Sequence, residues 1–204
     1  MNNLLRSVVT GVGAYLPETI VTNDDISKIV DTTDDWIVER TGIRQRHRAH
    51  DDQAASDLAC HAAQEALEKA GRKPADVDLI IVATTPDLTF PSVASMVQQK
   101  IGAPVGIAFD VQAVCSGFVY ALSVADGFVA RNRSKCALVI GAECMTRLMD
   151  WTDRGTCVLF GDGAGAIVVE PGEGEGTTAD RGLLGFALRA VAIAKGLALP
   201  AYRG

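Results

Sequence analysis

The residue best placed to do chemistry is Cys115. It follows a predicted strand over residues 107–111 and directly precedes a predicted helix over 116–130. Unpaired backbone amides and the positive end of the dipole at a helix N-terminus stabilise a thiolate. A thiolate on a tight strand-to-helix turn is suited to acyl transfer. The alternative is a small buried apolar side chain, which free cysteines commonly are, and position alone leaves both interpretations open.

A second candidate site is a cluster of arginines close to a tryptophan. Four arginines lie within the nine residues from Arg40 to Arg48, and Trp36 precedes the first of them by one helical turn. An indole plane beside guanidinium groups suits stacking on a nucleotide base and pairing with phosphates. A solvated basic turn is the alternative, and the residues themselves do not separate the two.

Other patterns do not support a ligand site. The glycine-rich run over residues 161–166 lacks the Lys-Ser/Thr of a phosphate loop and precedes a strand, so we expect a tight turn. Gly11 and Gly13 are followed by Leu16 at the third glycine position of a dinucleotide fingerprint. The cysteines and histidines show no metal-ligand spacing, so no metal site and no disulfide framework are predicted. The remaining cysteines are expected to be structural; they are Cys60, Cys136, Cys144 and Cys157.

Composition indicates a globular cytoplasmic protein. The chain has 204 residues, 48% of them apolar, and a net charge of -6, which argues against intrinsic disorder and against nucleic-acid or membrane-surface binding. The charge is uneven, because residues 181–204 contain four basic residues and no acidic ones (+4), which leaves -10 on residues 1–180. Neither a signal peptide nor a membrane span is predicted.

Predicted strands and helices alternate along the chain. Strands are predicted over 7–17, 79–84, 107–111, 137–141 and 164–170, and helices over 22–30, 33–42, 53–70, 91–101 and 116–130. This alternation indicates an α/β fold with a mostly parallel sheet, and the continuous apolar run over 79–84 indicates a strand buried on both faces. The helix over 116–130 carries one charge in fifteen residues, so we expect it to be covered on both sides.

Three strings together resemble a known family. They are VDTTDDWIVERTGI at residues 30–43, FDVQAVCSGF at 109–118, and DRGT at 153–156 with FGDGAGA at 160–166. In this order they resemble β-ketoacyl-acyl-carrier-protein synthase III, and the resemblance covers residues 7 to 172.

The resemblance implies a thiolase-like fold of two βαβαβαββ halves packed in five layers. This chain would supply the first half, residues 1–172, and the second half would be missing. Residues 173–204 would form a linker and an atypical tail, whose Ala, Gly, Leu and Arg bias suggests a truncated or out-of-frame ending.

The resemblance also implies an activity and a set of site residues. The family condenses an acyl-CoA with malonyl-acyl carrier protein as the first step of fatty-acid synthesis, as a cytoplasmic homodimer that needs no cofactor beyond the thioester substrate. By position, Cys115 matches the acylated nucleophile, and Trp36 with Arg154 matches the pair that sandwiches the CoA adenine. Thr32 and Arg40 match neighbours at the nucleotide end.

An aromatic side chain is assigned to the dimer in the same way. Phe90 matches the residue that reaches into the partner's acyl pocket.

The chain departs from the family in lacking part of its catalytic machinery. The family completes its site with a His and an Asn from the second half and a C-terminal glycine-rich loop, and none of these is present in the sequence. Because each lost oxyanion donor lowers the rate by roughly 10²–10³, we expect this chain alone not to catalyse condensation. The alternatives are another thiolase-fold enzyme, such as a polyketide-type or hydroxymethylglutaryl-CoA synthase, and a non-catalytic CoA-binding remnant.

Overall fold

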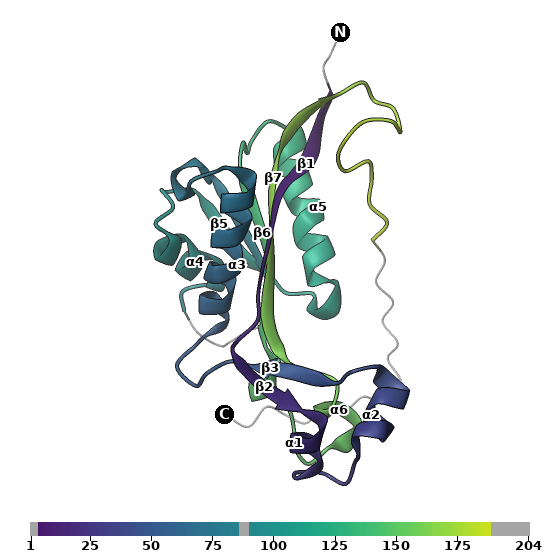
Figure 1. Cartoon of the computed structure of the whole chain (residues 1–204). Helices are drawn as coiled ribbons and strands as arrows, with labels where there is room; N and C mark the ends of the chain where they lie inside the picture. The colour runs from purple at the N-terminus through teal and green to yellow at the C-terminus, as the bar shows by residue number, and fades with distance from the viewer. Residues whose placement is uncertain (1–3, 86–89, 189–204) are drawn as a thin grey trace.

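The computed structural model describes residues 4–85 and 90–188 (Figure 1). The strands are β1 (Leu4–Tyr15), β2 (Thr19–Thr22), β3 (Gln45–Arg48), β4 (Leu79–Ala83), β5 (Ile107–Val111), β6 (Ala137–Cys144) and β7 (Asp162–Gly174). The α-helices are α1 (Asn23–Ser27), α2 (Asp34–Thr41), α3 (Ala55–Ala70), α4 (Val93–Ile101), α5 (Gly117–Ala130) and α6 (Arg154–Cys157). Short 3-10 turns are η1 (Pro74–Asp76), η2 (Val114–Ser116) and η3 (Met145–Arg147).

The central sheet has the strand order β1-β7-β6-β4-β5. β4 pairs in parallel with β5 and β6, while β7 runs antiparallel to β6 and to β1. β1, β4, β5 and β6 therefore point the same way and β7 is reversed, which confirms the predicted α/β fold with a mostly parallel sheet. Every residue of β4 is buried, as its continuous apolar run predicts.

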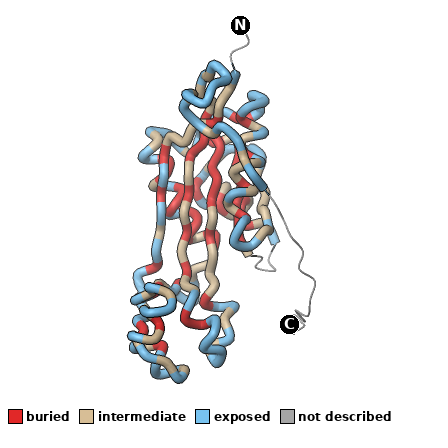
Figure 2. The backbone as a smooth tube through the Cα atoms, turned by 90° about the vertical axis from the view of Figure 1, so that its right-hand side faces the viewer, coloured by how far each residue is buried: buried red, intermediate tan, exposed pale blue. Residues whose placement is uncertain are grey.

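Helices cover both faces of this sheet. α3 and α4 pack on one face and α5 on the other (Figure 1). Buried residues run along the middle strands in the view of Figure 2. The core is therefore split by the sheet into two clusters, one built on α3 and α4 and the other on α5.

The predicted apolar helix, α5, is covered on one side only within the described residues. Its residues Ala121, Ala125 and Val129 are buried against the sheet. On its outer side Val119 is 46% exposed and Val124 is 38% exposed. The expectation of a second cover is therefore not met by the part of the chain that the structure describes. Residues 189–204, which belong to the expected atypical tail, lie outside the described residues.

A small lobe extends from one end of the sheet and consists of β2, β3, α1, α2 and α6 (Figure 1). β2 and β3 form a two-stranded antiparallel sheet, and Ile26, Ile37, Cys157 and Val158 form the lobe's own buried cluster. Sequence patterns missed both strands, because four residues are too few to show a period. The arginine-rich segment is divided between two elements, since Arg40 lies in α2 and residues 45–48 form β3.

The ends of α2 and α3 lie within two residues of the ends of the predicted helices over 33–42 and 53–70. The Thr33 hydroxyl accepts a hydrogen bond from the backbone of Trp36 at the start of α2, and Gly42 ends that helix at φ 73°. Gly71 ends α3 at φ 66°, as the sequence predicts. Among the described residues, no helix is both long and apolar enough to cross a bilayer.

The two glycines of β1 explain the Gly11-x-Gly13 pattern without a nucleotide. A Cβ atom at Gly11 would lie 2.1 Å from the carbonyl oxygen of Ala66, and one at Gly13 would lie 2.1 Å from that of Ala62. Both carbonyls belong to α3, so the absence of side chains lets the helix lie directly on the strand.

This packing predicts opposite effects for two glycine-to-alanine substitutions. Gly11→Ala forces backbone atoms apart and should lower the free energy of unfolding by about 3 kcal/mol. Gly127→Ala, in α5 with open space around the added methyl group, should raise it by about 0.5–1 kcal/mol through helix propensity. Urea unfolding followed by circular dichroism measures both, and a Gly11→Ala chain as stable as the parent would contradict the close contact of β1 with α3.

Candidate functional site

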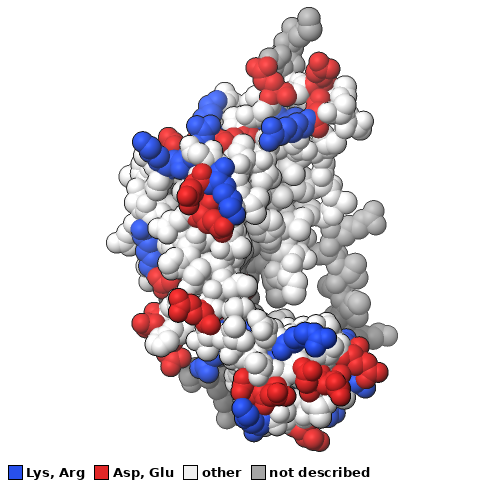
Figure 3. Space-filling view, in the orientation of Figure 1, with Lys and Arg blue, Asp and Glu red and all other residues white. Residues whose placement is uncertain are grey.

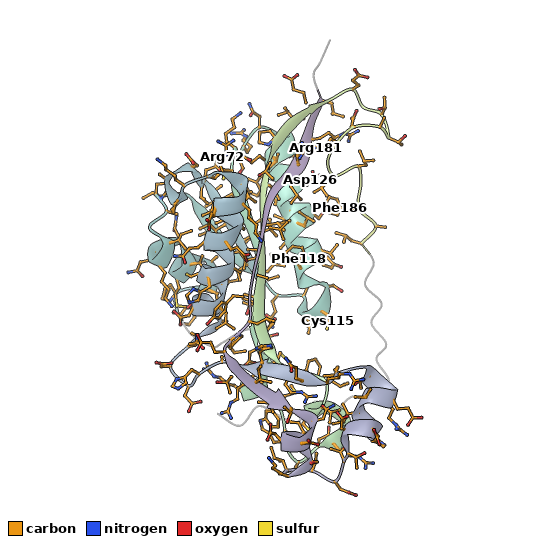
Figure 4. The ribbon with its side chains drawn as sticks, viewed as in Figure 1. Arg72, Cys115, Phe118, Asp126, Arg181 and Phe186 are labelled. Carbon is orange, nitrogen blue, oxygen red and sulfur yellow. The ribbon has the colours of Figure 1, made fainter. Side chains whose placement is uncertain are left out.

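Cys115 lies in η2, between the end of β5 and the start of α5. Cys115 is exposed, so the alternative of a small buried apolar side chain is wrong for this position. Figure 4 shows Cys115 at the end of α5 that is nearer the small lobe, with Phe118 further along the same helix. The backbone amides of the first turn of α5 follow it directly, which is the electrostatic setting expected for a nucleophilic thiolate.

The turn before Cys115 is strained. Val114 has φ 48°, in the left-handed region, where a β-branched side chain is a genuine outlier that costs roughly 1–3 kcal/mol. The strain occurs where the chain leaves the sheet and enters a helix lying on its face. Its consequence is that Cys115 stays outside the core.

Burial raises the pKa of three other thiols. Cys60, Cys136 and Cys157 are buried, and burial raises the pKa of Cys60 to about 11 and that of Cys136 to about 12. Burial also raises the pKa of Cys157. These thiols remain protonated at neutral pH, which agrees with the structural role predicted for them.

Cys115 opens onto an apolar cleft of about 530 Å³. Figure 3 shows the molecule hollowed between the end of α5 and the small lobe. The walls come from η2, α5, the ends of β4 and β6, the start of β7 and the loop before it. The lining residues are Leu16, Ala83, Thr85, Val114, Cys115, Phe118, Gly141, Ala142, Glu143, Met145, Phe160, Gly161, Gly163, Ala164 and Gly165.

Glu143 is a functional candidate that sequence reasoning missed. Its carboxylate accepts hydrogen bonds from the backbone amide of Thr85 at 2.7 Å and from the Thr85 hydroxyl at 3.0 Å. Burial raises the pKa of Glu143, although the two bonds from Thr85 oppose the shift. The only available signal was its place at the carboxyl end of a strand, where parallel sheets collect their functional side chains.

The predicted nucleotide-binding residues come together in the small lobe. The guanidinium carbons of Arg40 and Arg154 lie 4.5 Å and 4.8 Å from the centroid of the Trp36 ring. Arg40 belongs to α2, like Trp36, whereas Arg154 begins α6 and donates a hydrogen bond to the carbonyl of Asp31 at 2.9 Å. Residues far apart in the sequence therefore form one cationic and aromatic surface.

The two other residues assigned by resemblance occupy contrasting positions. Thr32 lies just before α2, and its hydroxyl is buried without a hydrogen-bond partner among the described residues. Phe90 is fully exposed.

The histidines lie away from the Cys115 cleft. His61 stacks on Tyr15 with ring centroids 4.4 Å apart, and Nδ1 of His47 lies within hydrogen-bonding distance of the carbonyl of Pro17. His50 is exposed and contacts Asp52. Among the residues lining the cleft there is neither His nor Asn in the described part of the chain.

The raised pKa of Glu143 predicts a pH-dependent stability. At neutral pH the Glu143 side chain of the folded chain is a half-buried carboxylate. As the pH falls, this carboxylate begins to take up a proton at a pH above the ordinary glutamate pKa of about 4.3. Wild type should therefore gain stability relative to Glu143→Gln as the pH falls from neutral toward that value. Urea midpoints at several pH values measure the difference, with Glu173→Gln as the control for a lost surface charge. A difference that does not vary with pH would contradict the burial effect.

Comparison with known proteins gives consistent matches. A family model for 3-oxoacyl-[acyl-carrier-protein] synthase III matches residues 109–190. The chain is 80% identical over 187 residues to β-ketoacyl-[acyl-carrier-protein] synthase III of Caulobacter vibrioides, covering 91% of this chain and 58% of that protein. It is 60% identical over 181 residues to the protein of the same name from Rhodospirillum centenum, covering 88% and 56%.

Solved structures give the same result. The 3-oxoacyl-[acyl-carrier-protein] synthase III of Aquifex aeolicus superposes with a TM-score of 0.78 at 50% identity, over 80% of this chain and 53% of that one. The priming β-ketosynthase of the R1128 polyketide pathway superposes with a TM-score of 0.80 at 39% identity, over 84% and 52%. The chain spans somewhat more than half the length of these relatives. With its thiolase-like fold and this level of identity, the chain belongs to the β-ketoacyl-[acyl-carrier-protein] synthase III family.

Proposed function

We propose that the chain is the acyl-accepting part of an initiating condensing enzyme of fatty-acid synthesis, in which Cys115 takes an acyl group from acyl-CoA. The observation that carries the proposal is the exposed Cys115 at the N-terminus of α5, on a strained turn at an apolar cleft. High identity to named synthases supports the same reaction.

The proposed reaction is a thioester exchange. The Cys115 thiol loses its proton to solvent, and the thiolate sulfur attacks the carbonyl carbon of the acyl-CoA. The tetrahedral intermediate collapses as the bond to the CoA sulfur breaks, and the CoA thiolate takes up a proton. The products are acyl-Cys115 and free CoA, and no cofactor takes part. The apolar walls of the cleft suit the acyl chain.

The nucleotide end of the CoA is assigned to the Trp36 surface. Adenine would stack on Trp36 with Arg154 on its other side, and Arg40 and Thr32 would contact the phosphate and ribose groups nearby. In the structure the Arg154 guanidinium already lies over the Trp36 ring, so an inserted adenine has to lift it away. The cationic surface also favours the negative charge of the phosphates.

We propose acyl carrier protein as the second substrate and a second copy of this chain as the partner. β5 is the edge strand of the sheet, and an edge strand offers unpaired amides and carbonyls to another strand. Phe90 and Val105 are fully exposed, which suits apolar contacts in an assembled homodimer in the cytoplasm. Phe90 would then enter the partner's acyl pocket.

We propose residues 1–172 as the first half of the thiolase-like fold and 173–204 as a linker and atypical tail. The last strand of the sheet, β7, ends at Gly174, close to that boundary. The family match continues to residue 190, so the resemblance reaches into the proposed linker. The proposed boundary therefore marks the end of the β-sheet and not the end of the resemblance.

A second candidate function is that of a polyketide-type priming condensing enzyme. The superposition on a priming β-ketosynthase at 39% identity favours it. Both enzymes would load Cys115, so they differ in the acyl group and the carrier protein accepted. A non-catalytic CoA-binding remnant is the remaining alternative.

Acyl transfer and condensation are tested together by incubating the 204-residue chain with acetyl-CoA and then with malonyl-acyl carrier protein. We expect mass spectrometry to find one acetyl group on Cys115, present in Cys144→Ser and absent in Cys115→Ala. We expect no CO₂ release, because each missing oxyanion donor lowers the rate by roughly 10²–10³.

Two results would overturn parts of this proposal. An unmodified chain would indicate a remnant that binds CoA without reacting. Release of CO₂ by the purified chain would show that the described cleft is sufficient for decarboxylative condensation.

A further inference from the structure

Arg46 is a buried arginine in the small lobe that has no ion-pair partner among the described residues. It lies on β3 and is 5% exposed. Its Nη1 donates to the side-chain oxygen of Asn23 at 2.9 Å, and its Nη2 donates to the carbonyl of Val158 at 3.0 Å. Its Nε is buried without a partner, and burial lowers the pKa of the guanidinium. Because a buried cation without an ion-pair partner is costly, its presence here points to a role that an apolar residue would not fill.

One arm of the Arg46 network holds α2. The side-chain amide of Asn23 donates to the Asp34 carboxylate at 2.7 Å and to the carbonyl of Ile43 at 2.8 Å. Asp34 is the first residue of α2, and Ile43 follows the glycine that ends it. Asn23 therefore fixes both ends of the helix that carries Trp36.

The other arm holds α6. Val158 is the residue that caps the C-terminus of this helix, and Arg154 is its first residue. The following loop lies close on β3, since a Cβ atom at Gly161 would be 2.9 Å from Cβ of Arg46. Arg46 therefore anchors the helix from which Arg154 extends over Trp36.

We propose that Arg46 is a positioning residue for CoA binding: by tying α6 to the Asn23-linked α2, it keeps Arg154 facing Trp36. The inference rests on the proposed assignment of the CoA nucleotide to Trp36. The planar guanidinium donates in two directions at once, to a side chain on one side and to a carbonyl on the other. A lysine at this position keeps the charge but loses the fixed geometry of the two bonds.

The test compares Arg46→Lys with Arg48→Lys, a control on the same strand whose arginine is 52% exposed and pairs with Asp51. Two quantities are measured on the full 204-residue chain. Acrylamide quenching of Trp36 fluorescence, in a Trp151→Phe background, reports whether Arg154 still covers the ring. Calorimetric titration with CoA reports binding, with Trp36→Ala as the reference for a lost stacking surface.

We expect Arg46→Lys to increase quenching of Trp36 and to weaken CoA binding by about tenfold, equivalent to about 1.4 kcal/mol. The rate of Cys115 alkylation by iodoacetamide should match the control, because neither Arg46 nor any residue to which Arg46 and Asn23 donate lines the Cys115 cleft. A general structural defect would change that rate as well, so a change in it would overturn the positioning role.

The proposal would also be overturned if Arg46→Lys agreed with the Arg48→Lys control to within about twofold in both Trp36 quenching and CoA affinity. If the parent chain itself does not bind CoA, the proposed function fails, and the quenching result alone still decides whether Arg46 positions Arg154. If Arg46→Lys does not fold, Asn23→Ala decides by the same criteria, since it removes the link to α2 while leaving Arg46 in place.

Discussion

Three parallel strands, β5, β4 and β6, end at the same edge of the sheet, and the candidate site depends on this alignment. Each strand delivers one functional group there: Cys115 follows β5, Thr85 follows β4, and Glu143 lies near the end of β6. β7 begins at this edge and contributes small residues to the cleft wall. Parallel pairing is sustained by complete burial of β4 between helices. The packing of the apolar strands therefore determines where the candidate site lies.

The passage from β5 to α5 places Cys115 at the surface beside this alignment. The chain has to turn from a sheet edge onto a sheet face within a few residues, and Val114 adopts a left-handed conformation to do so. Surrounding packing supports the turn on both sides: the Asp110 carboxylate binds the first amides of α4 at 2.8 Å, and α5 is held on the sheet by Ala121 and Ala125. Local strain is thus offset by contacts of rigid elements.

Much of the fold could be predicted from the sequence, because its long elements carry strong patterns. α3 ends at Ala70, the last residue of its predicted range, and β4 corresponds to the apolar run. The two-stranded sheet of β2 and β3 could not be predicted, since four-residue strands have no measurable period. Cys115 was identifiable from its place between a strand and a helix. The contact of Arg154 with Trp36 was available only through family resemblance, because local patterns do not reveal a pairing over such a sequence distance. Glu143 was missed for the same reason: its partner, Thr85, follows another strand, β4.

We infer that Cys115, the exposed thiol, is the reactive one of the five cysteines and that burial protects Cys60, Cys136 and Cys157. Competitive labelling of the native chain with limiting iodoacetamide, followed by peptide mass spectrometry, tests it most directly. The account predicts that Cys115 is alkylated well before Cys60, Cys136 and Cys157, which are buried, and that denaturant removes the difference. Alkylation of a buried cysteine as fast as Cys115 in the native chain would contradict it.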